Sequence, residues 1–169
     1  MTAFLDQKIP SRVRRNHGLE HATIHVLGKK HPWVGTAGLS DAGGFWIIGN
    51  LELDAVTDAA VEALERLRAG EKGLAYHPNC GTNFATTGVI AGLFAWLSML
   101  GVRNNWKAKL DRLPQVMTMT TLAVVLAQPL GAKFQIKVTT SPDMGKLELT
   151  GITVYERAGY RAFRINTKG

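Results

Sequence analysis

Two long stretches without a charged residue dominate the hydrophobic pattern of the chain. Residues 84–102 form the more apolar stretch, whose length is close to the about 20 residues that a helix needs to cross a bilayer. Residues 113–132 form the second stretch, which is more polar because it contains threonines and a Gln128-Pro129 pair. The segment between them is basic and contains Trp106, a residue type that anchors helices at membrane interfaces. The pattern therefore predicts a two-helix transmembrane hairpin with a cationic turn.

Two buried helices of a soluble α+β domain are the alternative interpretation of the same pattern. A small soluble domain rarely contains two consecutive helices that both lack a charged face, and this favours the membrane interpretation. Gly88 and Gly92 add a pair of small residues at which another helix can approach closely. The orientation stays open, because basic residues lie in the turn of the hairpin and also near both of its ends.

The rest of the chain is patterned like an α+β protein. Helices are predicted over residues 11–28 and 54–68. Strands are predicted over residues 34–39, 45–53, 133–139, 147–155 and 160–166. The expected order is an αββα N-terminal part, the apolar helical hairpin and a βββ C-terminal part. We accordingly divide the chain into an N-terminal α+β domain (1–82), a transmembrane hairpin (83–132) and a C-terminal β segment (133–169).

Composition and charge narrow the classes of partner. The chain has 169 residues and a net charge of +7, and its mean hydropathy lies near zero. A basic chain favours nucleic acid or an anionic membrane surface as a neighbour, but the spacing of the basic residues matches no nucleic-acid-binding module. The single cysteine, Cys80, excludes a framework of internal disulfides. We therefore expect a lipid bilayer as partner and no nucleic acid.

The pattern that carries chemistry is His17-x-x-Glu20-His21, in the first predicted helix. Two histidines four positions apart lie on one side of a helix and can bind one metal ion. A carboxylate in this position is typical of inverted zincins, in which it acts as general base toward a metal-bound water. These side chains also share an apolar stripe of the helix, so they are predicted to be buried and to need partners. We expect zinc or another divalent metal at His17 and His21, with Glu20 as the catalytic base.

A catalytic zinc site of this kind needs a third protein ligand. His77 and Cys80 are favoured, with His77 preferred, because both are good zinc ligands in a turn just before the first apolar stretch. Four acidic residues are the alternatives: Glu62, Glu65, Glu71 and Asp41. His25 continues the row of histidines, but its helical phase places it at the flank, outside the ligand set. The interpretation without a metal is a buried hydrogen-bond network of histidine and glutamate.

Two blocks, Asn16-His-Gly-Leu-Glu-His-Ala-Thr23 and His77-Pro-Asn-Cys-Gly-Thr-Asn83, resemble an uncharacterised family of small bacterial membrane proteins from cyanobacteria and Chloroflexi-type bacteria. The likeness covers most of the chain. It implies a membrane hairpin and two joined histidine blocks, and it implies no activity. The similarity to inverted-zincin metallopeptidases is confined to residues 17–21, and the downstream glutamate helix of those enzymes has no convincing counterpart here.

These features together predict a small integral membrane metalloprotein of the bacterial cytoplasmic membrane that acts as a zinc-dependent hydrolase of peptides. The alternative is a non-catalytic subunit or assembly factor of a membrane complex, photosynthetic complexes included. Its hairpin would then pack against a membrane-protein partner or a second copy of the chain. A third interpretation uses the imidazoles to ligate haem or chlorophyll. The substrate, the metal and the oligomeric state are left open by the sequence.

Overall fold

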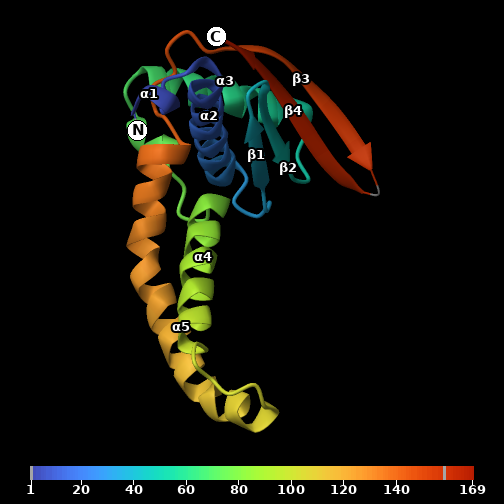
Figure 1. Cartoon of the computed structure of the whole chain (residues 1–169). Helices are drawn as coiled ribbons and strands as arrows, with labels where there is room; N and C mark the ends of the chain where they lie inside the picture. Colours follow the sequence, from blue (N-terminus) through green and yellow to red (C-terminus); the bar gives the residue numbers. More distant parts are fainter. Residues whose placement is uncertain (1, 158) are drawn as a thin grey trace. The chain divides into compact units, whose positions relative to one another are not determined.

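A computed structural model describes residues 2–157 and 159–169 of the protein (Figure 1). The chain forms two units. The first, called the α/β unit, contains residues 1–77 and 136–169, and the second, called the hairpin unit, contains residues 78–135. Segments from both ends of the chain therefore fold together in the α/β unit.

The α/β unit is a four-stranded antiparallel sheet with helices packed on it. The strands are β1 (Ala37–Asp41), β2 (Gly44–Ile48), β3 (Glu148–Arg157) and β4 (Tyr160–Lys168), in the spatial order β1-β2-β4-β3. The helices are α1 (Thr2–Leu5), α2 (Lys8–Lys30) and α3 (Leu53–Arg68), followed by the 3-10 turn η1 (Lys72–Ala75). The N-terminal and C-terminal segments share one sheet because β2 pairs with β4, with Ile47 opposite Phe163.

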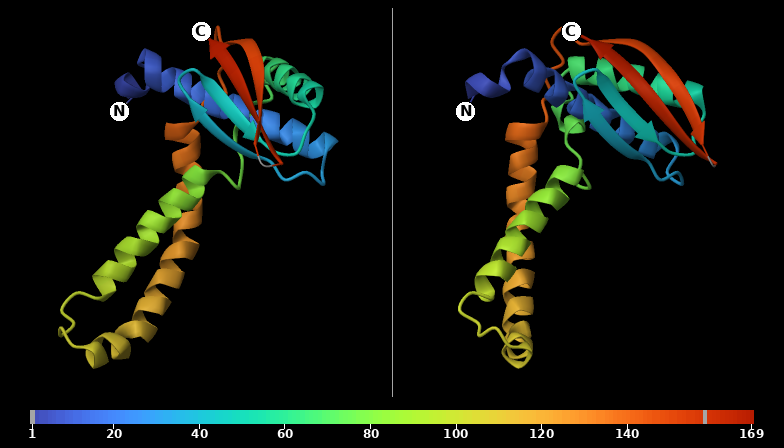
Figure 2. Two further views of the ribbon diagram at one scale, coloured as in Figure 1. Left: turned by 90° about the vertical axis from the view of Figure 1, so that its right-hand side faces the viewer. Right: turned by 45° about the vertical axis from the view of Figure 1, so that its right-hand side comes forward.

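Alternation of side chains along the strands determines which face of the sheet is covered. Phe45 and Ile47 of β2 and Phe163 and Ile165 of β4 are fully buried, and neighbouring residues point to the opposite face. The buried face packs on α2 and α3 in one hydrophobic core (Figure 2). Helix α3, predicted over residues 54–68, faces this core with one apolar stripe, whose buried residues are Val56, Ala59, Ala60, Ala63, Leu64 and Leu67.

Helix α2 is the central helix of this unit and carries the histidine motif. Pro10 is compatible with its first turn, and Lys29 and Lys30 in its last turn suit the negative end of the helix dipole. The helix contacts α3, β1, β2 and η1. Its buried residues consequently lie on all sides: Asn16, Gly18, Leu19, Glu20, His21, Ala22, Thr23, Val26 and Leu27.

The hairpin unit consists of two helices, α4 (Gly81–Ser98) and α5 (Trp106–Phe134), which pack along each other (Figure 2). Asn105 caps α5, because its Oδ1 accepts a hydrogen bond from the Ala108 N–H at 2.8 Å. Small residues of α5 allow α4 to approach, and a Cβ on Gly131 would lie 3.1 Å from the Cα of Asn83. The buried residues of α5 are accordingly Ala123, Ala127 and Gly131.

The transmembrane prediction is confirmed only in part. Among the described residues, one helix is long and apolar enough to cross a membrane, the 34-residue helix Trp106–Thr139 made of α5 and a π-helical turn (Gln135–Thr139). Helix α4 does not reach this standard, because glycine, threonine and asparagine occupy its first turn and the helix ends after 18 residues. Of the two predicted spanning helices, one meets the criterion of length and hydropathy.

Residues 133–139, predicted as a strand, are helical instead. Their short alternation of basic and apolar residues also fits the end of a long helix, and so short a segment cannot separate the two. The C-terminal part is therefore ββ and not βββ. Strand β2 also ends at Ile48, short of the predicted end, because Gly49 and Asn50 turn the chain.

Candidate metal centre

The two histidines of the motif lie side by side on α2. The ring centroids of His17 and His21 are 4.4 Å apart, and the nitrogens that they offer as ligands lie within 4.8 Å of each other. Imidazoles that share a tetrahedral zinc ion have centroids about 5 Å apart, given Zn–N bonds of about 2 Å. The spacing of the motif therefore produces a pair of rings at a separation suited to one ion.

Backbone carbonyl groups determine which nitrogen each of these rings presents. The Nδ1 atom of His21 lies 2.8 Å from the carbonyl oxygen of Ala75, and the Nδ1 atom of His17 lies 3.0 Å from that of Thr139. A carbonyl oxygen can only accept, so each Nδ1 carries the proton and donates it. The lone pair of each ring is then on Nε2. The carbonyl partner fixes the orientation of the ring and raises its basicity as a ligand.

Two further histidines extend the pair into a row. The centroid of His77 lies 5.9 Å from that of His21 and 4.8 Å from that of His25. His21 is buried, with 2% of its surface exposed, whereas the other three rings are half-buried. His77, a predicted ligand, is thus brought to the motif by the fold of the α/β unit. Its contact with His25 is not predicted by the sequence.

Glu20 lies beside strand β1. Its carboxylate accepts a hydrogen bond from the hydroxyl of Ser40, and only 4% of the residue is exposed. A Cβ on Gly38 would come closer than 3.0 Å to this carboxylate, so the glycine provides the space that Glu20 occupies. The candidate base therefore has a defined partner on β1, and its catalytic role stays a prediction.

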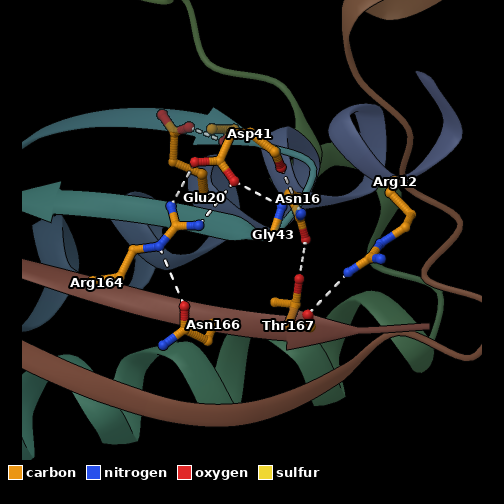
Figure 3. A network of polar contacts seen from close by, with 9 residues as sticks. Arg12, Asn16, Glu20, Asp41, Gly43, Arg164, Asn166 and Thr167 are labelled. Atoms are coloured by element: carbon orange, nitrogen blue, oxygen red, sulfur yellow. Dashed lines mark hydrogen bonds and ion pairs between the residues drawn. The ribbon is translucent and has the colours of Figure 1, made fainter. Parts of the chain in front are cut away.

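A polar network fixes the turn of α2 that precedes His17 (Figure 3). The side chain of Asn16, which is fully buried, donates to the Asp41 carbonyl and accepts from the Thr167 hydroxyl, both at 2.8 Å. Arg164 binds both carboxylate oxygens of Asp41 at 2.8 Å. These hydrogen bonds lower the pKa of Asp41 below its ordinary value. The network thus ties α2 to β1 and β4 next to the histidines.

The acidic residues considered as alternative third ligands are engaged elsewhere or face solvent. Arg66 forms ion pairs with Glu62 at 3.3 Å and with Glu71 at 2.6 Å. Its hydrogen bond lowers the pKa of Glu71. Asp41 is held by the arginine described above, and Glu65 is exposed on α3. These contacts favour the histidine and cysteine donors over the carboxylates.

Cys80 begins α4. Its Sγ accepts a hydrogen bond from the N–H of Thr82 at 3.4 Å, so the residue is the N-cap of the helix. The N-terminus of a helix favours a negatively charged group, and thiolate is the form of cysteine that binds metals. In the sequence, Cys80 follows His77 by three positions.

Comparison with known proteins gives a family for the chain. A model for a domain of unknown function, DUF6391, matches residues 12–152, which include both histidine blocks. The chain belongs to this family. An uncharacterized protein of Picosynechococcus sp. strain PCC 7002 is 32% identical in an alignment 142 residues long, and the match covers 76% of this chain and 66% of that protein. No solved structure matches the chain.

The resemblance to an uncharacterised bacterial family is thereby confirmed, and family membership brings no activity with it. The structure adds His25 to the group of neighbouring imidazole rings, although its helical phase places it outside the predicted ligand set. Eight residues separate His17 from His25, which corresponds to a rotation of about 80°. A side chain from a neighbouring segment can contact histidines that differ by such an angle on the helix, and the His77 ring contacts both His21 and His25. The signal for this contact in the sequence was the repeat of histidine at every fourth position, at 17, 21 and 25.

Proposed function

We propose that this protein is a membrane-anchored metalloprotein whose ion, zinc or another divalent transition metal, is bound by His17 and His21. The observation that carries the proposal is the pair of hydrogen bonds from the Nδ1 atoms of these residues to backbone carbonyls. Both rings thereby present Nε2, and metal-binding histidines are oriented in this way in many proteins. The separation of the rings also suits a shared ion.

The third donor in this proposal comes from residues 77–80. The ring of His77 lies 5.9 Å from that of His21, about 1 Å more than the spacing of imidazoles on one tetrahedral ion, so ligation requires the His77 side chain to move toward His21. Cys80, the other predicted donor, follows His77 by three positions in the sequence. Imidazole and thiolate donors together suit zinc. Three protein ligands leave a fourth position for water, as in catalytic zinc sites.

Hydrolysis of a peptide by the metal-bound water is the reaction proposed for this site. Glu20 is the proposed general base, because it follows His17 by three residues on α2, as in inverted zincins. Its burial raises the free energy of the charged carboxylate, and the hydrogen bond from Ser40 compensates part of this cost.

The hairpin unit is the proposed membrane anchor. Helix α4 has no buried residue, and only 11% of the most apolar window of the helix Trp106–Thr139 is buried. Soluble monomers rarely expose continuous apolar surface of this extent. With 29 residues, α5 is about 43 Å long, and α4 with 18 residues is about 27 Å long, against a hydrocarbon thickness of about 30 Å. We therefore retain α4 as the proposed second span of the cytoplasmic membrane.

Elemental analysis of the full chain purified in detergent tests the metal site. We expect about one zinc ion per chain in the wild type and its loss in His17→Ala and in His21→Ala. His31→Ala is the matched control, because His31 lies at the C-terminal end of α2, outside the row of ring contacts, and it should retain the ion. The variants His77→Gln and Cys80→Ser identify the third donor. A wild-type chain without metal after loading with zinc would contradict the proposal.

The hydrolytic step has its own test. Glu20→Gln should abolish cleavage of a fluorogenic peptide mixture while the metal content stays at the wild-type level, because the glutamine keeps the shape of the side chain but accepts no proton. Cleavage that persists with the metal in place would show that Glu20 is not the base. That result would leave the metal site itself untouched.

A second candidate function is supported by the open face of α4. A Cβ on Gly88 or on Gly92 would meet no other atom within 4 Å, so this pair is not used in the contact with α5. In a membrane such a pair admits a further helix, from a second copy or from another protein. A metal-free chain found in a stable membrane complex, which Gly88→Leu disrupts, would favour the role of a non-catalytic subunit.

A further inference from the structure

His25 stands apart from the proposed ligands, yet it takes part in the same row of rings. It lies one turn after His21 on α2, and its ring centroid is 4.8 Å from that of His77. This separation is closer to the about 5 Å expected for imidazoles on one tetrahedral ion than the 4.4 Å of the first pair. The row therefore contains two pairs of rings at ligand spacing.

The tautomer of His25 is also determined by a backbone carbonyl. Its Nε2 lies 2.8 Å from the carbonyl oxygen of Tyr76, so Nε2 carries the proton and the lone pair is on Nδ1. A hydrogen bond to a backbone carbonyl also orients His17 and His21, but in these two rings Nδ1 is the donor and Nε2 carries the lone pair. Each helical histidine of the row thus donates to a carbonyl from one defined nitrogen and presents the other one.

The two pairs differ in their access to solvent. His21 is 2% exposed, so a hydrated ion cannot reach it without first losing water. His25 and His77 are both half-buried. Imidazole pairs at accessible positions bind zinc, copper and nickel ions in preference to calcium or magnesium. An ion can therefore exchange part of its hydration shell for these two rings before it reaches the buried one.

We propose that His25 and His77 form an outer site that takes up a divalent transition metal and passes it to the inner site at His21 and His17. This inference rests on the proposed metal site, since transfer needs a tighter inner site. His77 contacts both His25 and His21, so the ion changes one ligand at a time while His77 stays bound. Each step replaces one neutral imidazole or water by another, and no proton or electron is transferred.

Zinc uptake by the full chain in detergent tests this proposal. The metal-free protein is mixed with zinc held by a fluorescent chelator, and the rate of transfer and the number of ions bound are recorded. The wild type should bind one tight ion, because His77 serves the outer site and the inner site in turn. His25→Gln, which can still donate to the Tyr76 carbonyl but is a poor ligand, should keep the tight ion and load at least tenfold more slowly. His31→Gln should behave as the wild type.

The outcomes separate the two proposals. A wild type that binds no tight ion refutes the proposed function, and transfer with it. A tight ion together with an unchanged uptake rate in His25→Gln refutes the outer site alone. Loss of the tight ion in His25→Gln also overturns the outer site, because His25 would then belong to the inner one. Retention of the tight ion shows in the same experiment that the variant is folded.

Discussion

Gly18 lies in the middle of α2, where a glycine weakens a helix by about 1 kcal/mol relative to alanine. Its nearest neighbour in space is a backbone segment, and the Cβ of Ala75 is the next nearest. A Cβ at this position would come closer than 3.0 Å to the carbonyl oxygen of Ser141 and to 3.1 Å from its carbonyl carbon. The segment is held there by the hydrogen bond from the Ser141 N–H to the Arg14 carbonyl at 2.9 Å. The glycine therefore allows α2 and this segment to touch.

We expect Gly18→Ala to destabilise the protein although alanine is the better helix former. Overpacking costs about 1–3 kcal/mol, and the upper end applies because the clashing atoms belong to a fixed backbone. Subtraction of the gain of about 1 kcal/mol in helix propensity leaves a net loss of about 2 kcal/mol. Gly28 in the same helix is exposed and has nothing within 4 Å of an added Cβ. Gly28→Ala should therefore stabilise by about 0.5–1 kcal/mol.

Thermal unfolding of the full chain in detergent, followed by circular dichroism, measures both variants. One kcal/mol shifts the melting temperature of a chain of this size by about 2–4 °C. Gly18→Ala should thus melt about 4–8 °C below the wild type, and Gly28→Ala should melt a few degrees above it. An equal gain in both variants would refute the close approach at Ser141. The displaced segment also carries the Thr139 carbonyl, so Gly18→Ala should weaken zinc binding at His17.

Three other perturbations test the polar groups around α2. The contact with Arg164 lowers the pKa of Asp41 in the folded protein. It therefore stabilises the fold above the ordinary aspartate pKa, and this stabilisation is lost as the pH falls through the folded-state pKa. Arg164→Met should make the free energy of unfolding depend less on pH on the acid side, as measured by unfolding between pH 3 and 7. Asn16→Leu removes both hydrogen bonds of a buried amide and should lower stability by about 2–3 kcal/mol in the same melting assay. Gly38→Ala should displace the Glu20 carboxylate and accelerate hydrogen exchange in β1; unchanged exchange would contradict the close contact.

Patterns of neighbouring residues were sufficient to predict the helices and to identify the residues of the His17-x-x-Glu20-His21 motif. The stripe of α3 and the burial of α2 on all sides follow from helical periodicity, which is a property of neighbouring residues. The pairing of His17 with His21 follows from the same period. The same local reasoning failed at residues 133–139, because an alternation over so few positions fits the end of a helix as well as a strand.

The sequence by itself determined that two histidines and a glutamate share one buried helix, and that an apolar helical segment follows. The tertiary structure decided what surrounds them. The carbonyl partners of His21 and His17 lie 54 and 122 positions away in the chain, and the sheet joins β2 to β4 across a similar distance. Partners this remote are chosen by how the whole core packs. No periodicity of neighbouring residues encodes which carbonyl meets which ring, and these contacts set the nitrogen that each histidine presents.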